Sequence, residues 1–342
     1  FYGIGGGVLC PTGQTLGGYS GLWDFIVPDT TPFKTWDGGG GDNNWSTGAN
    51  WSGDTAPVSS FTLKLAFDGS TRTAPVLNSD YNINTLRFET GAGAFALTSS
   101  GGGGGSDLTF GGSVPSIIQL SANNQSVNIP FVLNSTTIVE ASGAGSLTLA
   151  GEISGSGGIT KLGAGTLLLS GANSYSGATT VDAGTVTLRH ATALGSTAAG
   201  TTVSSGATLQ LENSISVGAE ALALNGTLRN VSGVNTYGGA ISGTGNVIVS
   251  AGNLTLSGAA ANTYTGATTL NTGQLDLAKT AGITAVAGNL VVGDGTGAAT
   301  LRLINSNKIA DTARVTLADT GTPVFNVNGK AETIGSITSN NT

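Results

Sequence analysis

The second half of this 342-residue chain carries one sequence pattern twice. The stretch ISGSGGI at 153–159 returns as ISGTGNV at 241–247, and SYSGATTV at 174–181 returns as TYTGATTL at 263–270. The copies are offset by 88 residues at Ile153 and by 89 residues at Tyr175. A repeat of Gly, Thr, Ser and alternating aliphatic residues is typical of stacked β-structure. It predicts a solenoid, whose function has to come from its surfaces and ends.

Pairs of aliphatic residues separated by one position recur about every 20 residues in both copies. The pairs are Leu147/Leu149, Leu167/Leu169, Val186/Leu188 and Leu209/Leu211, followed by Leu254/Leu256, Leu275/Leu277 and Leu301/Leu303. Residues i and i+2 of a strand share one face, so each pair points toward the same side. A coil of this length suits one turn of a parallel β-helix with three short strands. About ten such turns, at roughly 4.8 Å each, would extend near 50 Å.

The composition divides the chain into three predicted parts. All four Trp lie within the first 51 residues, and seven of the eight Pro precede residue 131. Residues 1–34 form an apolar extension with one predicted strand, residues 22–27, whose side chains Leu22, Trp23, Phe25, Ile26 and Val27 are the candidate subunit contact. They could instead fold back as a cap on their own solenoid. Residues 35–143 form a Trp- and Gly-rich irregular β lead-in and capping region, with strands expected at 62–67, 85–88, 94–98, 108–110, 117–120 and 127–129. Residues 144–342 form the regular β-solenoid.

Charge and cysteine content exclude several classes of partner. A net charge of −7 and a pI near 4.5 disfavour nucleic acid and anionic membrane surfaces. No apolar run approaches the ~18 residues that a membrane-spanning helix needs. Cys10 is the one cysteine, so no intrachain disulfide can form. With only 9% charged residues, the chain suits a secreted surface protein better than a cytosolic enzyme.

Residues 162–181 (LGAGTLLLSGANSYSGATTV) resemble the autotransporter-associated β-strand repeat of bacterial passenger domains. The second copy, ending at Thr269, is similar but has two extra residues before its Tyr264. Residues 35–51 resemble the N-terminal lead-in of large repeat proteins of this kind. The resemblance implies an all-β, right-handed parallel β-helix, secretion, and an extracellular or outer cell-surface location. It does not imply one activity.

Residues that could carry catalysis are few and scattered along the regular part. Its acidic residues do not recur one turn apart, so they predict no pair of carboxylates of the kind that glycosidases use. His190 is the one histidine and cannot build a multi-histidine metal site. We therefore assign no catalytic residue and expect no cofactor.

Two groups of residues in the lead-in are candidates for binding. The first supplies oxygen atoms around the glycines at 38–41 and is a weak calcium candidate: Asp37, Asp42, Asn43 and Asn44. Its spacing does not match an EF-hand, and an Asx-rich turn is the alternative. The second group is aromatic and consists of Trp36, Trp45 and Trp51. These rings either stack on a carbohydrate or cap the apolar core at the first turn.

The sequence favours a non-enzymatic, secreted bacterial structural protein. We expect a homo-oligomer or homopolymer, in which the N-terminal strand joins subunits of an extracellular filament or surface layer. One alternative is an adhesin-type passenger that binds carbohydrate or a cell surface. The other is a polysaccharide-degrading β-helix enzyme, which would need acids and a base converging on one face.

Overall fold

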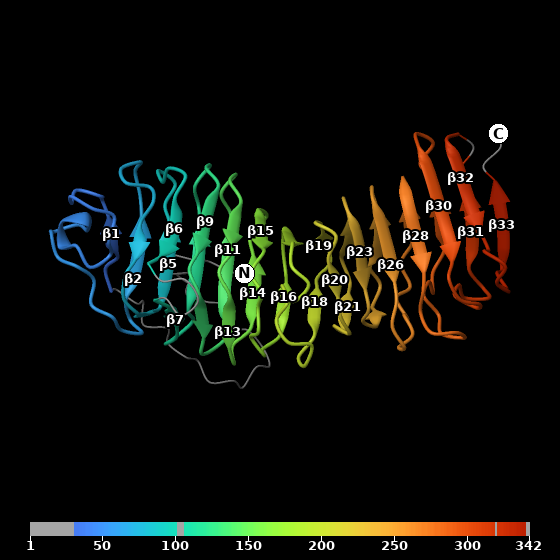
Figure 1. Ribbon diagram of the computed structural model, residues 1–342, viewed down its shortest axis with the longest axis horizontal. Coiled ribbons are helices and arrows are strands. Elements are labelled where there is room, and N and C mark those ends of the chain that lie inside the picture. The colour runs from blue at the N-terminus through green and yellow to red at the C-terminus, as the bar shows by residue number, and fades with distance from the viewer. Residues whose placement is uncertain (1–30, 101–105, 319, 340–342) are drawn as a thin grey trace, which may run out of the picture. The chain divides into compact units, whose positions relative to one another are not determined.

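The computed structural model describes residues 31–100, 106–318 and 320–339. It divides into two units, residues 1–32 and residues 33–342. The second unit is a β-solenoid of parallel sheets (Figure 1). Apart from the short 3-10 helix η1 (Gly48–Asn50), its described residues form strands and turns. The all-β class and the stacked parallel architecture predicted from the repeat are confirmed.

Two sheets run along most of the solenoid. Sheet A contains, in order, β1 (Lys34–Trp36), β2 (Lys64–Phe67), β5 (Thr85–Phe88), β8 (Ser116–Gln119), β11 (Thr137–Ala141), β14 (Ile159–Leu162), β16 (Thr179–Val181), β18 (Thr201–Val203), β21 (Leu222–Leu224) and β24 (Ile241–Ser242). Sheet B contains β3 (Val76–Leu77), β6 (Ala96–Ser99), β9 (Gln125–Asn128), β12 (Leu147–Leu149), β15 (Thr166–Leu169), β17 (Thr185–Leu188), β19 (Thr208–Leu211), β22 (Thr227–Asn230), β25 (Asn246–Val249), β27 (Thr268–Leu270), β29 (Leu290–Val292), β31 (Arg314–Leu317) and β33 (Ser336–Ser339).

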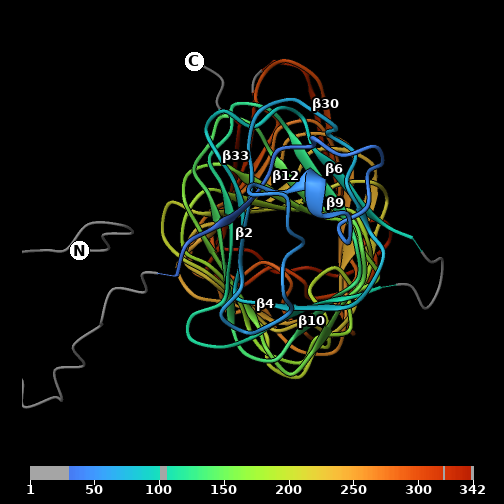
Figure 2. The same cartoon turned by 90° about the vertical axis from the view of Figure 1, so that its left-hand side faces the viewer.

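The third face is shared by two shorter sheets. Sheet C contains β4 (Tyr81–Ile83), β7 (Leu108–Phe110), β10 (Phe131–Leu133) and β13 (Ile153–Gly155). Sheet D contains β20 (Ser216–Val217), β23 (Val234–Tyr237), β26 (Asn253–Leu256), β28 (Gly273–Leu277), β30 (Ala298–Leu303) and β32 (Thr322–Asn326). As far as β26, the chain passes from sheet A to sheet B and then to the third face, which carries a strand in most turns. From β27 to β33, the strands alternate between sheets B and D. Viewed end on, the turns superimpose as a ring around the core (Figure 2).

Sheets A and B cross the boundary at residue 143 without a break. Strand β11 pairs in parallel with β14, and β12 pairs with both β9 and β15. Residues 35–143 therefore supply the first turns of the same solenoid, with longer connections between strands. Ten of the thirteen sheet B strands, β12 to β33, come from residues 144–342.

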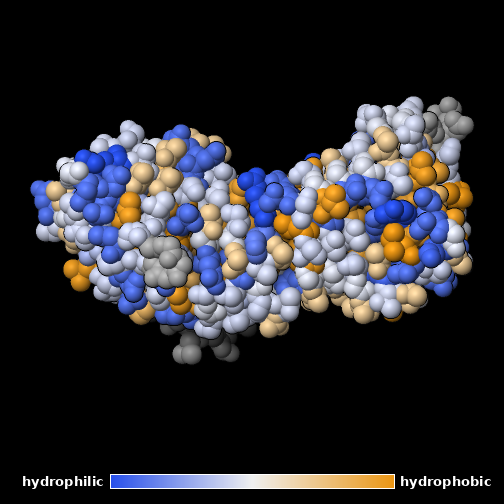
Figure 3. All heavy atoms as spheres, viewed as in Figure 1, coloured by the Kyte–Doolittle hydropathy of each residue, from blue (hydrophilic) through white to orange (hydrophobic). Residues whose placement is uncertain are grey.

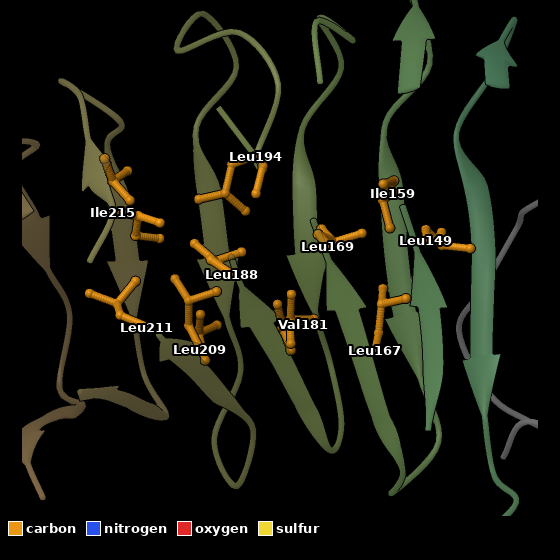
Figure 4. Packing of buried hydrophobic residues seen from close by; sticks show 14 of the residues in the cluster. Leu149, Ile159, Leu167, Leu169, Val181, Leu188, Leu194, Leu209, Leu211 and Ile215 are labelled. Atoms are coloured by element: carbon orange, nitrogen blue, oxygen red, sulfur yellow. The ribbon is translucent and has the colours of Figure 1, made fainter. Parts of the chain in front are cut away.

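The predicted aliphatic pairs stack in register and fill the interior. Leu149, Leu169, Leu188 and Leu211 are consecutive partners along sheet B, and each is at most 1% exposed. Figure 4 shows these side chains beside Val181 of sheet A in the same core. Burying one such side chain fully contributes about 1.5–3 kcal/mol, so stability accumulates turn by turn.

The two repeat copies place equivalent strands on different faces. Strand β15 lies in sheet B, whereas its sequence equivalent β26 lies in sheet D. Likewise β14 lies in sheet A and its equivalent β25 in sheet B. Four complete turns lead from β15 to β25, and one further face leads to β26. The 88-residue repeat thus spans four and one third turns, and the second copy is advanced by one face.

Candidate functional sites

The three tryptophans of the lead-in form an aromatic cap on the first turns. Trp36, Trp45 and Trp51 are each 0% exposed and surround Phe67 at ring-centroid distances of 6.1, 5.7 and 5.9 Å. Trp51 also packs edge-on against both other indoles, at 5.2 and 5.6 Å. Helix η1 lies at this end of the solenoid in Figure 2. The indoles offer no exposed ring face on which a sugar could stack, which supports the capping alternative.

Hydrogen bonds fix the position of two of these indoles. Trp51 Nε1 donates to Trp45 O at 2.7 Å, and Trp36 Nε1 donates to Arg72 O at 3.2 Å. Trp45 Nε1 is buried without a partner. The cap covers apolar core surface that the first turn would otherwise leave open to water.

The carboxylate of Asp42 organises the glycine-rich loop of this cap. Its oxygens accept hydrogen bonds from Asn44 N at 3.0 Å, Asn44 Nδ2 at 3.0 Å, Thr47 Oγ1 at 2.9 Å and Asn50 Nδ2 at 3.2 Å. These bonds hold the pKa of Asp42 below its usual value, with the backbone amide of Asn44 as the largest cause. Both carboxylate oxygens therefore already have protein donors.

The remaining calcium candidates are similarly engaged. Asp37 Oδ1 accepts the amide of Gly39 at 3.1 Å, and Asn43 Oδ1 accepts from Arg72 Nη1 at 3.4 Å. In the described part of the chain, no three His, Cys, Asp or Glu residues come together as metal ligands. The arrangement is that of an Asx-rich turn.

The candidate subunit contact falls outside the described residues. Leu22, Trp23, Phe25, Ile26 and Val27 belong to the segment 1–30, so their role stays a prediction.

Charged side chains on the solenoid surface pair locally between turns. Arg189 Nε donates to Glu212 Oε2 at 2.8 Å. Arg302 Nε and Nη2 donate to the two carboxylate oxygens of Asp276 at 2.9 and 2.6 Å. His190 is half-buried, and its Nδ1 lies 3.1 Å from Thr192 Oγ1 within the same loop. Figure 3 shows hydrophilic and hydrophobic residues interspersed over one face. The partly exposed Arg189–Glu212 pair contributes about 0–1 kcal/mol, whereas Asp276 of the second pair is 8% exposed. Neither is an acid–base pair across a cleft.

An asparagine in each repeat ties three successive turns together. Asn173 Oδ1 accepts the amide of Ile153 at 3.0 Å, and its Nδ2 donates to Ala193 O at 2.7 Å. In the second copy, Asn262 makes the same two bonds, to Ile241 N at 3.0 Å and Ala285 O at 2.8 Å. Asn173 and Asn262 are 4% and 1% exposed. We call each of these side chains, with its two bonds, an asparagine clamp.

A tyrosine two residues after each clamp lies entirely in the core. Tyr175 Oη lies 2.6 Å from Thr179 Oγ1, and Tyr264 Oη lies 2.6 Å from Thr268 Oγ1. Both tyrosines are 0% exposed. The motif N-x-Y-x-G-A-T-T thus encodes a polar cross-link inside the core, in which the Asn, Tyr and first Thr side chains form the hydrogen bonds.

Three lysines have no exposed surface, which the sequence did not predict. Lys161, Lys279 and Lys308 are each 0% exposed. Lys161 Nζ donates to Leu162 O and Gly163 O at 2.8 Å and to Ala183 O at 3.2 Å. Lys279 Nζ donates to Gly239 O at 2.9 Å and Ser257 O at 2.8 Å, which lie on earlier turns.

The third ammonium group is also bound by backbone carbonyls. Lys308 Nζ likewise bonds three carbonyls, those of Thr280, Ile283 and Asn307, at 2.8, 2.9 and 3.2 Å. Burial lowers the pKa of Lys161 and of Lys279 to about 8 and lowers that of Lys308. No local signal distinguishes these lysines from surface ones, because each also depends on carbonyls of another turn, such as Ala183 O for Lys161 and Thr280 O for Lys308.

Two segments of the chain, residues 159–188 and 249–277, match the family model of the passenger-associated-transport-repeat. The chain carries this passenger repeat twice. The first match covers β14 to β17 and contains one asparagine clamp, and the second reaches β28 and contains the other. The resemblance to autotransporter passenger repeats is therefore confirmed, and the solenoid is consistent with a passenger-type β-helix.

Searches of the curated proteins and of the solved structures each gave no match. Among the described residues, no helix is long and apolar enough to span a membrane.

Proposed function

We propose that this chain is a non-enzymatic structural β-solenoid, exported to the bacterial exterior like other passenger-type proteins. The main support for this proposal is that both passenger-associated-transport-repeats belong to one continuous stack of parallel strands. Their most regular residues, such as Asn173 and Tyr175, bond to the protein itself and face the core. Because these polar side chains form hydrogen bonds inside the protein, they are not available to a ligand, which supports a scaffold role for the repeat.

The finer part of the proposal is assembly into a filament or surface layer. Residues 22–27 read as a short apolar strand, and sheet edges in a solenoid accept added strands through unpaired backbone groups. These features support a contact between copies.

Electron microscopy of the purified 342-residue chain tests assembly directly. We expect regular filaments or sheets from the unaltered chain and dispersed rods after Phe25→Lys, because a charge in the strand opposes its burial. Leu16→Lys is the matched control, since it adds the same charge to the same segment outside residues 22–27. Assembly that survives Phe25→Lys, or that Leu16→Lys abolishes equally, would refute a joint at residues 22–27.

The adhesin alternative rests on a carbohydrate or a cell surface as ligand. Its proposed platform, Trp36, Trp45 and Trp51, is buried, so a glycan would have to bind elsewhere. Dispersed rods that retain specific glycans on an array would favour this function over assembly.

A further inference from the structure

A carboxyl group lies buried halfway along the solenoid, between β20 and β21. Glu220 is 2% exposed. Its Oε1 accepts a hydrogen bond from Thr201 Oγ1 at 2.7 Å, whereas its Oε2 is buried with no hydrogen-bond partner. The ion pairs described on this chain, at Arg87–Glu89, Arg189–Glu212 and Arg302–Asp276, do not include it.

The side chains that form hydrogen bonds with Glu220 are polar but uncharged. Thr201 begins β18 and pairs in sheet A with Thr179 of β16, whose hydroxyl is bonded to Tyr175. Tyr237 of β23 donates from its hydroxyl to the backbone carbonyl of Glu220 at 2.9 Å. Burial, and to a smaller extent the nearby Glu220 carboxyl, raises the pKa of both tyrosines.

One cation approaches the same corner from a later turn. Gly239 packs so closely on Glu220 that a Cβ at Gly239 would lie within 1.7 Å of Glu220 O. Lys279 Nζ donates to the carbonyl of Gly239, but this ammonium is already shared with Ser257 O. Glu220 therefore has a hydroxyl on one oxygen, no donor on the other, and tyrosines beside it.

Ionisation of a carboxyl group in such surroundings is costly, because a buried charge loses hydration that one hydroxyl does not replace. Protonation removes the charge and leaves the bond from Thr201 to Oε1 in place. Burial accordingly raises the pKa of Glu220, and the Thr201 hydrogen bond opposes this only in part.

We propose that Glu220 is an acid-responsive latch: the solenoid is most stable with this carboxyl protonated, and ionisation weakens the turns from β18 to β24. The latch works within the fold and does not depend on whether the chain forms filaments.

The direction of the pH effect follows from proton linkage. A glutamate in the unfolded chain ionises near its usual pKa of 4.5, whereas folded Glu220 keeps its proton to higher pH. Between these two values the unfolded state binds fewer protons than the folded state, so the contribution of Glu220 falls as pH rises. The folding equilibrium constant loses up to about tenfold per pH unit across that interval. The full contribution is present below pH 4.5.

Urea unfolding of the full chain between pH 4 and 8 tests the latch. The ratio of folding equilibrium constants, wild type over Glu220→Gln, removes the pH dependence of all other groups. We expect this ratio to fall as pH rises through the interval and then to level off. Glu140→Gln is the matched control, because Glu140 also accepts one hydroxyl bond, from Ser142 at 2.9 Å, but is only half-buried. Its ratio should show no such fall.

Infrared spectroscopy provides a readout that does not depend on unfolding. The difference spectrum, folded wild type minus folded Glu220→Gln, should contain a carboxylic-acid C=O band that persists above the usual glutamate pKa of 4.5. A pH-independent wild type to Glu220→Gln ratio, or the absence of that band from the difference spectrum, overturns the proposal.

Discussion

Removing one asparagine clamp should destabilise the solenoid far more than removing an exposed asparagine. In Asn173→Ala, the buried amide of Ile153 and the carbonyl of Ala193 lose their partners, at 3.0 and 2.7 Å. An unsatisfied buried polar group costs about 1–3 kcal/mol, so the two together predict a loss of about 2–6 kcal/mol. The lower end applies where water enters the space that the amide leaves.

Two measurements check this value at different levels. Urea unfolding gives the change in unfolding free energy, and native-state hydrogen exchange reports the Ile153 amide itself, which should exchange faster. Asn262→Ala should behave in the same way at Ile241, because that clamp has the same geometry.

Asn225→Ala is the control for side-chain loss alone. Asn225 is exposed and accepts from Thr244 N and Oγ1 only at 3.3 Å, so its loss should cost about 0.5 kcal/mol or less. The reasoning fails if Asn173→Ala costs no more than Asn225→Ala, or if the Ile153 amide keeps its protection.

Three further outcomes follow from the core. Tyr264→Phe removes the hydroxyl contact with Thr268 and should lower the free energy of unfolding in urea by about 1 kcal/mol. An unchanged unfolding midpoint would show that this hydrogen bond does not stabilise the fold. Gly239→Ala places a Cβ 1.7 Å from Glu220 O and should cost about 3 kcal/mol or prevent folding, whereas Gly206→Ala, with open space but a φ of 83°, should cost less. Because burial lowers the pKa of Lys161 from 10.5 to about 8, the unfolded state binds more protons between these values and stability should rise with pH there. Lys161→Met should reduce that rise, as thermal unfolding between pH 7.5 and 10.5 would show.

The strand pattern was readable from local sequence because each turn must bury the same kind of face. Residues 85–88 and 108–110 were predicted as strands and form β5 and β7 with those bounds. The aliphatic pairs were predicted from period-two alternation, and Leu167 and Leu169 stack on Val186 and Leu188 as expected. Such patterns depend only on residues that are close in sequence and on which side chains are buried away from water.

The face on which each repeat lies could not be read in this way. All three faces bury similar aliphatic residues, so the pattern around β15 and around β26 is the same although one lies in sheet B and the other in sheet D. The assignment depends on the summed lengths of every intervening connection, which local pattern does not report. The buried lysines escaped prediction for a related reason, since Lys279 is satisfied by carbonyls of Gly239 and Ser257.

By itself, the sequence determined the architecture, the length of a turn, and the residues that face the core, because these follow from hydrophobic periodicity and turn chemistry. Only the tertiary structure decided which polar groups meet inside. The asparagine clamps, the bonds from Lys161 to Ala183 O and from Lys279 to Gly239 O, and the bond from Thr201 to Glu220 all join residues on different turns. The other carboxyl oxygen of Glu220 is left without a partner. Whether a buried charge or amide is stabilising depends on those partners, and stacking alone brings them together.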